Sequence, residues 1–280
     1  MENAKNLKSI KHHRILAVGE IGTGKSTQFL TIPGKKFAYI FDPNALATFA
    51  GWDIDYETFF PLAGELDFYP SSIKKDKKQF SDSKGRSFEP VTYLRWAEEV
   101  NKKMEAGFFD DYDALSIDGL TMFSASVMDR TIWLQNKVER DDERTDYRLA
   151  GDKVSNAIRA LTDLKITFFC TAHTEFFQDD KTKRLTNRIM LPGGSRVRVP
   201  TIFTNVFVMH GEFDEGEKYR YTIQTKPNRE NPIARTSIPG LGFEEDVTIP
   251  EDVLLAKDSK EITKYGVGAL LEGRKTVKGE

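Results

Sequence analysis

The feature that most restricts the fold of this chain is a glycine-rich octapeptide, Gly-Glu-Ile-Gly-Thr-Gly-Lys-Ser, at Gly19–Ser26. It fits the phosphate-binding loop pattern G-x-x-x-x-G-K-[ST]. The apolar run Arg14–Val18 before it predicts a buried strand, and Thr27–Leu30 after it can open a helix. Because strand, loop and helix follow in the order that the motif requires, the sequence predicts a site for a nucleoside triphosphate rather than a chance glycine-rich turn.

Each residue type in this loop has an expected role. Gly19, Gly22 and Gly24 are expected to take positive φ angles, so that backbone N–H groups turn inward around a phosphate. Lys25 is expected to reach the β- and γ-phosphates, and the Ser26 hydroxyl to hold Mg²⁺. We predict ATP and Mg²⁺ as ligands, although no base-reading motif decides between ATP and GTP. The predicted nucleotide contacts are Gly19, Glu20, Ile21, Gly22, Thr23, Gly24, Lys25, Ser26 and Thr27.

Charge and cysteine content narrow the class of protein. The formal net charge is −2 over 280 residues, so any contact with nucleic acid must come from a local basic patch. The single cysteine, Cys170, excludes an intramolecular disulfide and fits a reducing compartment. Met1–Arg14 lacks the apolar segment of a signal peptide, and no apolar run approaches the ~20 residues of a membrane helix. We therefore expect a cytoplasmic protein without a membrane partner, in the host cytoplasm if a phage encodes it.

Strand-like and helix-like patterns alternate along the chain, which predicts an α/β fold with a mainly parallel sheet, flanking helices and antiparallel strands near the C-terminus. Strands are expected at 14–18, 36–42, 54–62, 112–118, 166–171, 205–210 and 218–226. Helices are expected at 90–104, at 120–138 and after 144.

We divide the chain into an N-terminal arm at 1–13, an ATPase domain at 14–248 and a C-terminal segment at 249–280. The sequence of the C-terminal segment predicts a weak helix followed by a polar tail, and the composition of this tail is typical of disordered segments. Residues 71–88 are rich in lysine, aspartate and serine and predict an exposed insertion loop.

A second strong signal is Asp118, which ends the apolar strand predicted at 112–118. A carboxylate at this place, downstream of a phosphate-binding loop, commonly holds Mg²⁺. The alternative is an ordinary aspartate in a turn with Gly119. Given the loop, we predict that Ser26 and Asp118 together form the metal site.

Two further strand ends are expected to face the nucleotide. Asp42 and Asn44 follow the strand predicted at 36–42, and Asp42 is the nearest candidate for a base opposite the γ-phosphate, with Glu20 as a competitor. His173 and Glu175 follow the strand at 166–171 and could sense the γ-phosphate by hydrogen bonding. The predicted catalytic set is Lys25, Asp42, Asn44, Asp118 and His173.

The order of these motifs resembles the RecA-like ATPase core. It is most similar to the compact phage recombination ATPases of the Sak group, which are linked to single-strand annealing. The resemblance covers about residues 14–245 and rests on Gly19–Ser26, Asp42-Pro43-Asn44, Ile117-Asp118-Gly119 and Thr171–Glu175.

The resemblance implies roles for particular residues. In the RecA family a glutamate after the second strand activates water, and the matching position here is Asn44, so turnover is slow or Asp42 substitutes. The family's polar sensor corresponds to His173, and its flexible DNA-binding loop to about residues 178–200.

The segment 178–200 carries a cluster of cations near a Gly-Gly hinge, without apolar periodicity, and predicts a mobile basic loop. A solvated loop with no ligand is the alternative. The candidate contacts to nucleic acid are Lys183, Arg184, Arg188, Arg196 and Arg198. The resemblance further implies that Lys226, Arg229 or Arg235 reaches a neighbouring subunit's γ-phosphate.

Three functions follow from these observations. The first is an ATPase that binds single-stranded DNA as a homo-oligomer, in a ring or a filament, with a phage annealing or single-strand-binding protein as a partner. The second is a nucleotide-gated loader that recruits another protein without gripping DNA. The third is a small-molecule kinase with the basic segment as a lid.

Overall fold

The computed structural model describes residues 12–61, 89–135, 144–180, 182–213 and 218–273. The predicted insertion at 71–88, most of the N-terminal arm and the last seven residues lie outside these ranges. Within the described ranges, no helix combines the length and apolar character needed to cross a membrane.

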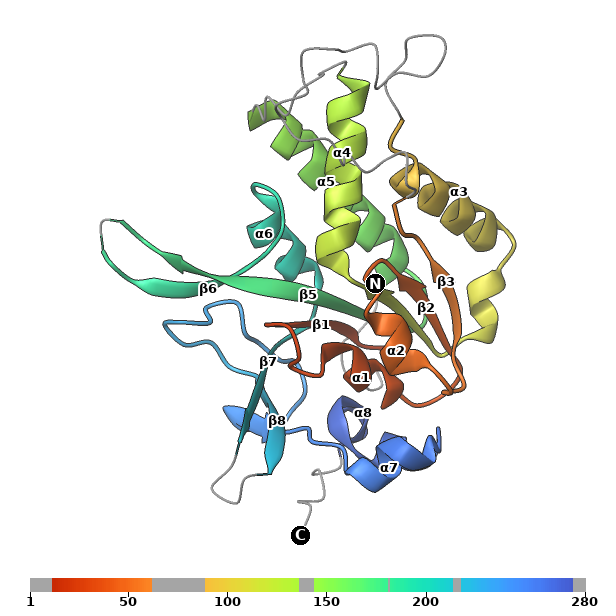
Figure 1. Cartoon of the computed structure of the whole chain (residues 1–280), viewed down its shortest axis with the longest axis vertical. Coiled ribbons are helices and arrows are strands. Elements are labelled where there is room, and N and C mark those ends of the chain that lie inside the picture. The colour runs from red at the N-terminus through yellow and green to blue at the C-terminus, as the bar shows by residue number, and fades with distance from the viewer. Residues whose placement is uncertain (1–11, 62–88, 136–143, 181, 214–217, 274–280) are drawn as a thin grey trace, which may run out of the picture.

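The architecture is a mixed sheet with helices on both faces (Figure 1). The strand order is β3-β2-β4-β5-β1-β7-β8-β9, with β6 paired to β5 outside this path. The strands from β3 to β7 run parallel, and β8 and β9 continue the sheet in antiparallel fashion. This arrangement confirms the predicted fold class. The strands are β1 (Arg14–Gly19), β2 (Lys36–Ile40), β3 (Asp55–Thr58), β4 (Ala114–Asp118), β5 (Thr167–Gln178), β6 (Leu185–Ile189), β7 (Asn205–Phe213), β8 (Tyr219–Gln224) and β9 (Glu244–Asp246).

The helices occupy two layers. The α-helices are α1 (Lys25–Leu30), α2 (Ala45–Phe49), α3 (Thr92–Glu105), α4 (Leu120–Leu134), α5 (Arg144–Thr162), α6 (Ser195–Arg198), α7 (Glu251–Ala256) and α8 (Gly266–Leu271). Short 3₁₀ turns lie at Phe108–Asp111, Val199–Ile202 and Glu261–Lys264. In Figure 1, α3, α4 and α5 lie above the sheet, and α1, α2, α7 and α8 lie below it.

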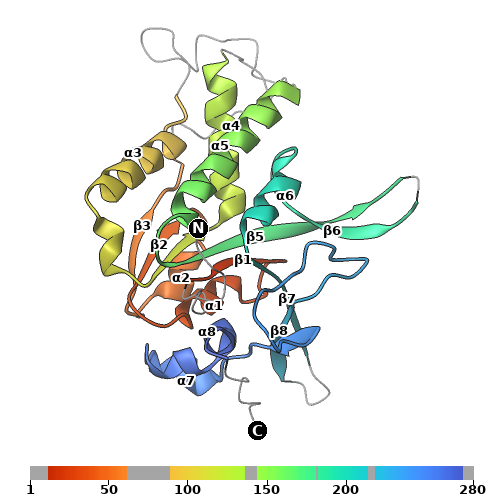
Figure 2. The ribbon, with the colours of Figure 1, turned by 180° about the vertical axis from the view of Figure 1, so that it is seen from behind.

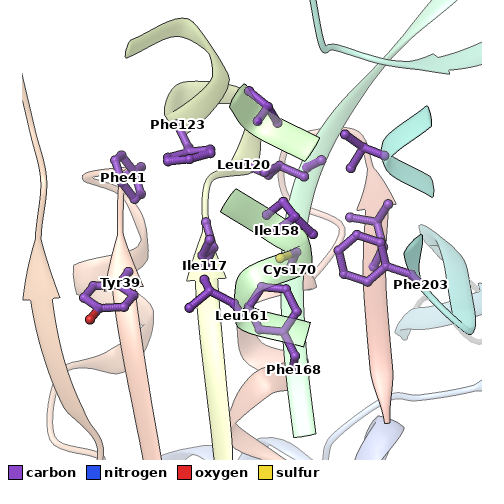
Figure 3. Packing of buried hydrophobic residues seen from close by; sticks show 14 of the residues in the cluster. Tyr39, Phe41, Ile117, Leu120, Phe123, Ile158, Leu161, Phe168, Cys170 and Phe203 are labelled. Atoms are coloured by element: carbon purple, nitrogen blue, oxygen red, sulfur yellow. The ribbon is translucent and has the colours of Figure 1, made fainter. Parts of the chain in front are cut away.

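Successive side chains along each strand point to opposite faces of the sheet, and because both faces are covered, two hydrophobic cores form, one on each face. On β1, Leu16 and Val18 join the core under α3, α4 and α5, whereas Ile15 and Ala17 join the core over α1 and α8. Figure 3 shows the first core, where Phe168 on β5 stacks against Phe203 at a centroid distance of 5.9 Å. Burial on both faces explains why these strands are apolar runs rather than alternating ones.

The C-terminal segment contains more helix than its sequence predicts, and it packs on the helix after the phosphate-binding loop. The Gln28 side chain of α1 accepts from the Val267 amide at 2.9 Å, and it also donates to the carbonyl of Val247, just before this segment, at 2.9 Å. The Gly268 amide donates to the Thr31 hydroxyl at 2.8 Å. A side chain on Gly268 would collide with the Thr31 backbone, so glycine is needed for this close approach.

The segment 178–200 is not the loop that the sequence predicts. Strand β5 continues past the edge of the sheet and pairs antiparallel with β6, from Thr174↔Ile189 to Gln178↔Leu185. The resulting β5–β6 hairpin projects away from the body of the protein in both views (Figures 1 and 2). Its apolar pattern is weak because most of it has no second layer to bury against, and for that reason the sequence suggested a loop.

Candidate nucleotide-binding site

The phosphate-binding loop joins β1 to α1 at the carboxyl edge of the parallel strands. Gly22 and Gly24 have φ angles of +81° and +76°, as predicted. Gly19 does not have a positive φ and remains part of β1. Glycine is required at Gly19 because a Cβ there would lie 2.7 Å from the Met209 carbonyl oxygen on β7. The prediction for Gly19 was therefore right about the residue and wrong about the reason.

The Lys25 amine is buried against its own loop. Its Nζ donates to the carbonyl oxygens of Gly19 at 3.0 Å and Glu20 at 2.5 Å. Burial lowers the pKa of Lys25 to about 8, although the carboxylates of Asp118, Asp42 and Glu20 act in the opposite direction. A triphosphate bound here would bring negative charge next to the Lys25 amine and would therefore favour its protonated, ammonium form.

Asp118 ends β4 with a buried carboxylate. Its Oδ1 accepts a hydrogen bond from the Thr171 hydroxyl at 3.2 Å, and that hydroxyl accepts from the Gly119 amide at 2.8 Å. Among the described residues, Asp118 Oδ2 has no hydrogen-bond donor although it is buried. Burial raises the pKa of Asp118 to about 6, while the nearby Ser26 and Thr171 hydroxyls lower it.

This environment fits a divalent cation. An unpaired buried carboxylate oxygen beside the Ser26 hydroxyl offers the oxygen ligands that Mg²⁺ prefers, and Mg²⁺ keeps several waters besides. No group of three or more His, Cys, Asp or Glu side chains suited to a metal occurs in the described part of the chain. Ser26 and Asp118 are the residues that would hold Mg²⁺.

Asp42 and His173 face each other over Asp118. His173 Nε2 lies 3.5 Å from Asp42 Oδ2, and both side chains are largely buried. The Asp42 Oδ1 accepts hydrogen bonds from the backbone amide and the side-chain amide of Asn44, each at 3.0 Å. Asn44 itself is exposed. The structure thus brings Asp42, Asp118, His173 and Lys25 together and places Asn44 behind Asp42 as a support.

The other predicted loop contacts fall into two groups. Glu20 and Ile21 are exposed at the tip of the loop, with Ile21 86% exposed. The Thr23 hydroxyl donates to the Glu20 carbonyl at 2.9 Å and shapes the loop, and Thr27 is half-buried on α1. Glu20 does not join the carboxylates beside His173, so its candidacy as the base loses support.

Two hydroxyl residues near the site escaped the sequence analysis. Thr171 links Asp118 to Gly119, and Thr121 accepts a hydrogen bond from the His173 amide at 3.0 Å. Thr121 follows the end of β4, whereas Thr171 lies inside β5 and is the last residue of the strand predicted at 166–171. Their position at or just after the end of a predicted strand was the available signal, but it does not say which strands are neighbours.

The cations of the β5–β6 hairpin have different surroundings. Lys183 is exposed in the turn with a φ of +54°. The Arg188 guanidinium lies 3.1 Å from the centroid of the Phe177 ring and opposite Glu175 in the register. Arg184 donates to the Arg229 carbonyl, at 3.2 Å from Nε. Lys183 and the stacked Arg188 therefore remain available to an anion, while Arg184 binds the hairpin to the loop beneath it.

The arginines that follow the hairpin in sequence are engaged in contacts within the protein. Arg198 pairs with Asp152 on α5, and Arg196 Nε donates to the Gly193 carbonyl at 3.0 Å. These contacts give no support to a lid over a kinase acceptor site.

Of the three candidates for a residue acting in a neighbouring subunit, Arg235 does not fit. Its guanidinium donates to the carbonyl oxygens of Pro200 and Phe203, and its backbone pairs with Val206 near the start of β7. Lys226 and Arg229 are exposed and remain candidates.

The family described as AAA domain matches residues 11–234, which is most of the chain and includes every element of the site. No curated protein matches the sequence.

Proposed function

Because the chain belongs to the AAA domain family of P-loop ATPases, we propose that it is a Mg²⁺-dependent ATPase whose nucleotide state controls binding of single-stranded DNA by the β5–β6 hairpin. The observation that carries this proposal is the continuity of β5. The same strand presents His173 beside Asp42 and, five residues later, ends in the projecting hairpin at Gln178.

The chemistry that we assign to the site is ATP hydrolysis. Asp42 would orient and deprotonate the attacking water, a role supported by the two hydrogen bonds from Asn44 that hold its carboxylate in position. Lys25 would bind the β- and γ-phosphates. Mg²⁺ held by Ser26 and Asp118 would supply positive charge that offsets the charge of the phosphates.

Coupling to the hairpin would run through His173. Burial, followed by the charge of Lys25, lowers the pKa of His173, so near pH 7 the ring is a neutral hydrogen-bonding group. Its contact with Asp42 is long enough at 3.5 Å to be exchanged for one to a γ-phosphate. A shift of this side chain acts on a strand whose far end is the hairpin, which supports a two-state switch in DNA affinity.

The hairpin has the chemistry of a single-strand binder. Lys183 in the turn and Arg188 supply cations, and Phe176, 58% exposed on the face of the hairpin opposite Arg188, supplies a ring on which a base can stack. The resemblance to Sak-group phage ATPases extends the proposal to recombination or annealing in the host cytoplasm. In that setting we expect a homo-oligomer and an annealing or single-strand-binding protein as partner.

A nucleotide-gated loader is the second candidate, and one observation favours it. A mostly apolar groove of about 320 Å³ lies at the root of the hairpin, between α4 and the residues after β6. Met190 in its wall is 42% exposed, and Glu175 and Asp129 add negative charge. Such a groove would suit an apolar, basic segment of a partner protein.

ATP hydrolysis with and without single-stranded DNA separates these functions. The proteins to compare are the wild type, Lys25→Ala, His173→Ala and the double variant Lys183→Gln/Arg188→Gln. We expect DNA to stimulate the wild type, Lys25→Ala to be inactive, and the last two to hydrolyse ATP without responding to DNA. If DNA neither binds nor stimulates the wild type, the loader function replaces DNA binding.

A further inference from the structure

Three aromatic rings form a row on the β7–β8 hairpin. Phe213 and Tyr219 have centroids 5.0 Å apart, and Tyr219 and Tyr221 have centroids 5.1 Å apart. Phe213 is 71% exposed and Tyr219 is 42% exposed. Exposure of adjoining rings is costly in water, which marks the row as a candidate binding surface.

The row lies on the face of the sheet that carries α1. Tyr219, Tyr221 and Ile223 alternate along β8, and Ile223 is buried in the core over α1. Phe213 stands directly opposite Tyr219 in the register, so it points to the same face. The row therefore starts in the core next to α1 and runs out into solvent.

Its inner end touches the phosphate-binding loop. A Cβ on Gly24 would lie 3.1 Å from the Tyr221 ring, so the ring rests on the residue that precedes Lys25. A Cβ on Gly211 would lie 2.9 Å from a ring carbon of Tyr219, so that ring covers the bare backbone of β7. Both tyrosine rings are thus seated against glycines, which limits their movement.

The sheet order tells which end of a triphosphate faces this row. Asp118, Asp42 and His173 mark the γ-phosphate end, and they come from β4, β2 and β5, all on one side of β1. Strands β7 and β8 lie on the other side of β1. A triphosphate whose γ end lies between Lys25 and Asp118 directs its nucleoside away from β5, toward Tyr221.

We propose that the Tyr221 ring forms the stacking surface for the nucleobase of the triphosphate held by the loop, with Tyr219 packed edge-to-face against it at an interplanar angle of 70°. This inference rests on the proposed ATPase function and adds a base site to it. Stacking depends on the π-face that every base has, so the site discriminates weakly between adenine and guanine. Neighbouring polar groups are engaged elsewhere, since Arg220 pairs with Asp246 and Thr248 bonds to the Tyr221 backbone.

The test compares ATP with inorganic tripolyphosphate, which has no base, by isothermal titration calorimetry in the presence of Mg²⁺. Tyr221→Leu is expected to weaken ATP binding roughly tenfold and Tyr219→Leu less than that, because Tyr219 only supports the Tyr221 ring, with tripolyphosphate binding changed less than about twofold in both. Tyr56→Leu is the matched control, because Tyr56 is 51% exposed on β3 at the opposite end of the sheet. The Tyr221→Phe variant should bind ATP like the wild type, because the ring does the stacking.

Several outcomes would overturn the inference. Equal losses of ATP and tripolyphosphate in Tyr221→Leu would mean that the ring only supports the loop. Unchanged ATP affinity with an altered oligomer size by light scattering would make the row a contact between subunits. A preference above about 100-fold for ATP over GTP would require hydrogen-bond readout of the base. If the wild type binds neither ATP nor tripolyphosphate, the ATPase function itself fails, and with it the base site.

Discussion

His173 on β5 contacts Asp42 at the end of β2, with Nε2 3.5 Å from Oδ2, although β4 runs between these two strands. The pair therefore bridges the strand that ends in Asp118. In the ATPase that we propose, this pair would face the γ-phosphate bound at Lys25 and would there activate water and sense the γ-phosphate.

Replacement of Asp42 tests which residue activates water. We expect Asp42→Asn to lower kcat by about 10²- to 10⁴-fold while ATP affinity changes little, because the base is lost but the phosphate contacts remain. Asn44→Ala should lower kcat less than about tenfold, since Asn44 only orients Asp42. Steady-state hydrolysis and ATP titration measure both effects. A larger loss in Asn44→Ala than in Asp42→Asn would assign the catalytic role to the Asn44 position.

We expect the Asp118→Asn substitution to abolish hydrolysis and to raise thermal stability. Burial raises the pKa of Asp118 to about 6, above its ordinary value of 3.8, so its negative charge costs folding free energy that increases as the pH rises from about 4 to 6. At pH 7.5 without nucleotide or metal, we expect Asp118→Asn to melt roughly 2–6 °C higher than the wild type. Near pH 4 the difference should disappear. Mg²⁺-dependent hydrolysis should be abolished, and a lower melting temperature at pH 7.5 would refute the electrostatic argument.

The salt dependence of DNA affinity tests the hairpin. Each phosphate contact to single-stranded DNA contributes about 0.7 to the slope of log K against log salt concentration. Lys183→Gln and Arg188→Gln should each reduce that slope by about this amount. Arg198→Gln is the matched control, because Arg198 pairs with Asp152, and its slope should stay close to that of the wild type. A reduced slope in Arg198→Gln alone would assign the DNA contact to α6 instead of the hairpin.

The Gln28 contacts predict that the C-terminal segment stabilises the ATPase core. Gln28→Ala would leave the Val247 carbonyl and the Val267 amide buried without their partner. We expect a loss of about 2–4 kcal/mol in the free energy of unfolding, measured by urea denaturation. Gln135→Ala, at an exposed glutamine after α4, should change stability by less than about 0.5 kcal/mol. Equal effects of the two substitutions would mean that the C-terminal segment contributes little.

The sequence alone determined the features that depend on residues close to one another along the chain. The phosphate-binding loop, its strand and its helix follow from glycine spacing and an apolar run within about twenty residues. The mainly parallel sheet follows from the alternation of strand-like and helix-like patterns. Asp42, Asp118 and His173 could be chosen as site residues because each lies at or just after the end of a predicted strand, and the carboxyl ends of parallel strands meet at one edge of the sheet.

The tertiary structure decided everything that depends on which distant segments are neighbours. Gly19 needs its glycine because of the Met209 carbonyl, and Arg235 is tied to Pro200 and Phe203, contacts that no local pattern encodes. The β5–β6 hairpin forms through cross-strand pairing without a second layer, so its strands lack the apolar alternation that would reveal them. The aromatic row faces the loop only because β7 packs beside β1, and strand order is a property of the folded sheet.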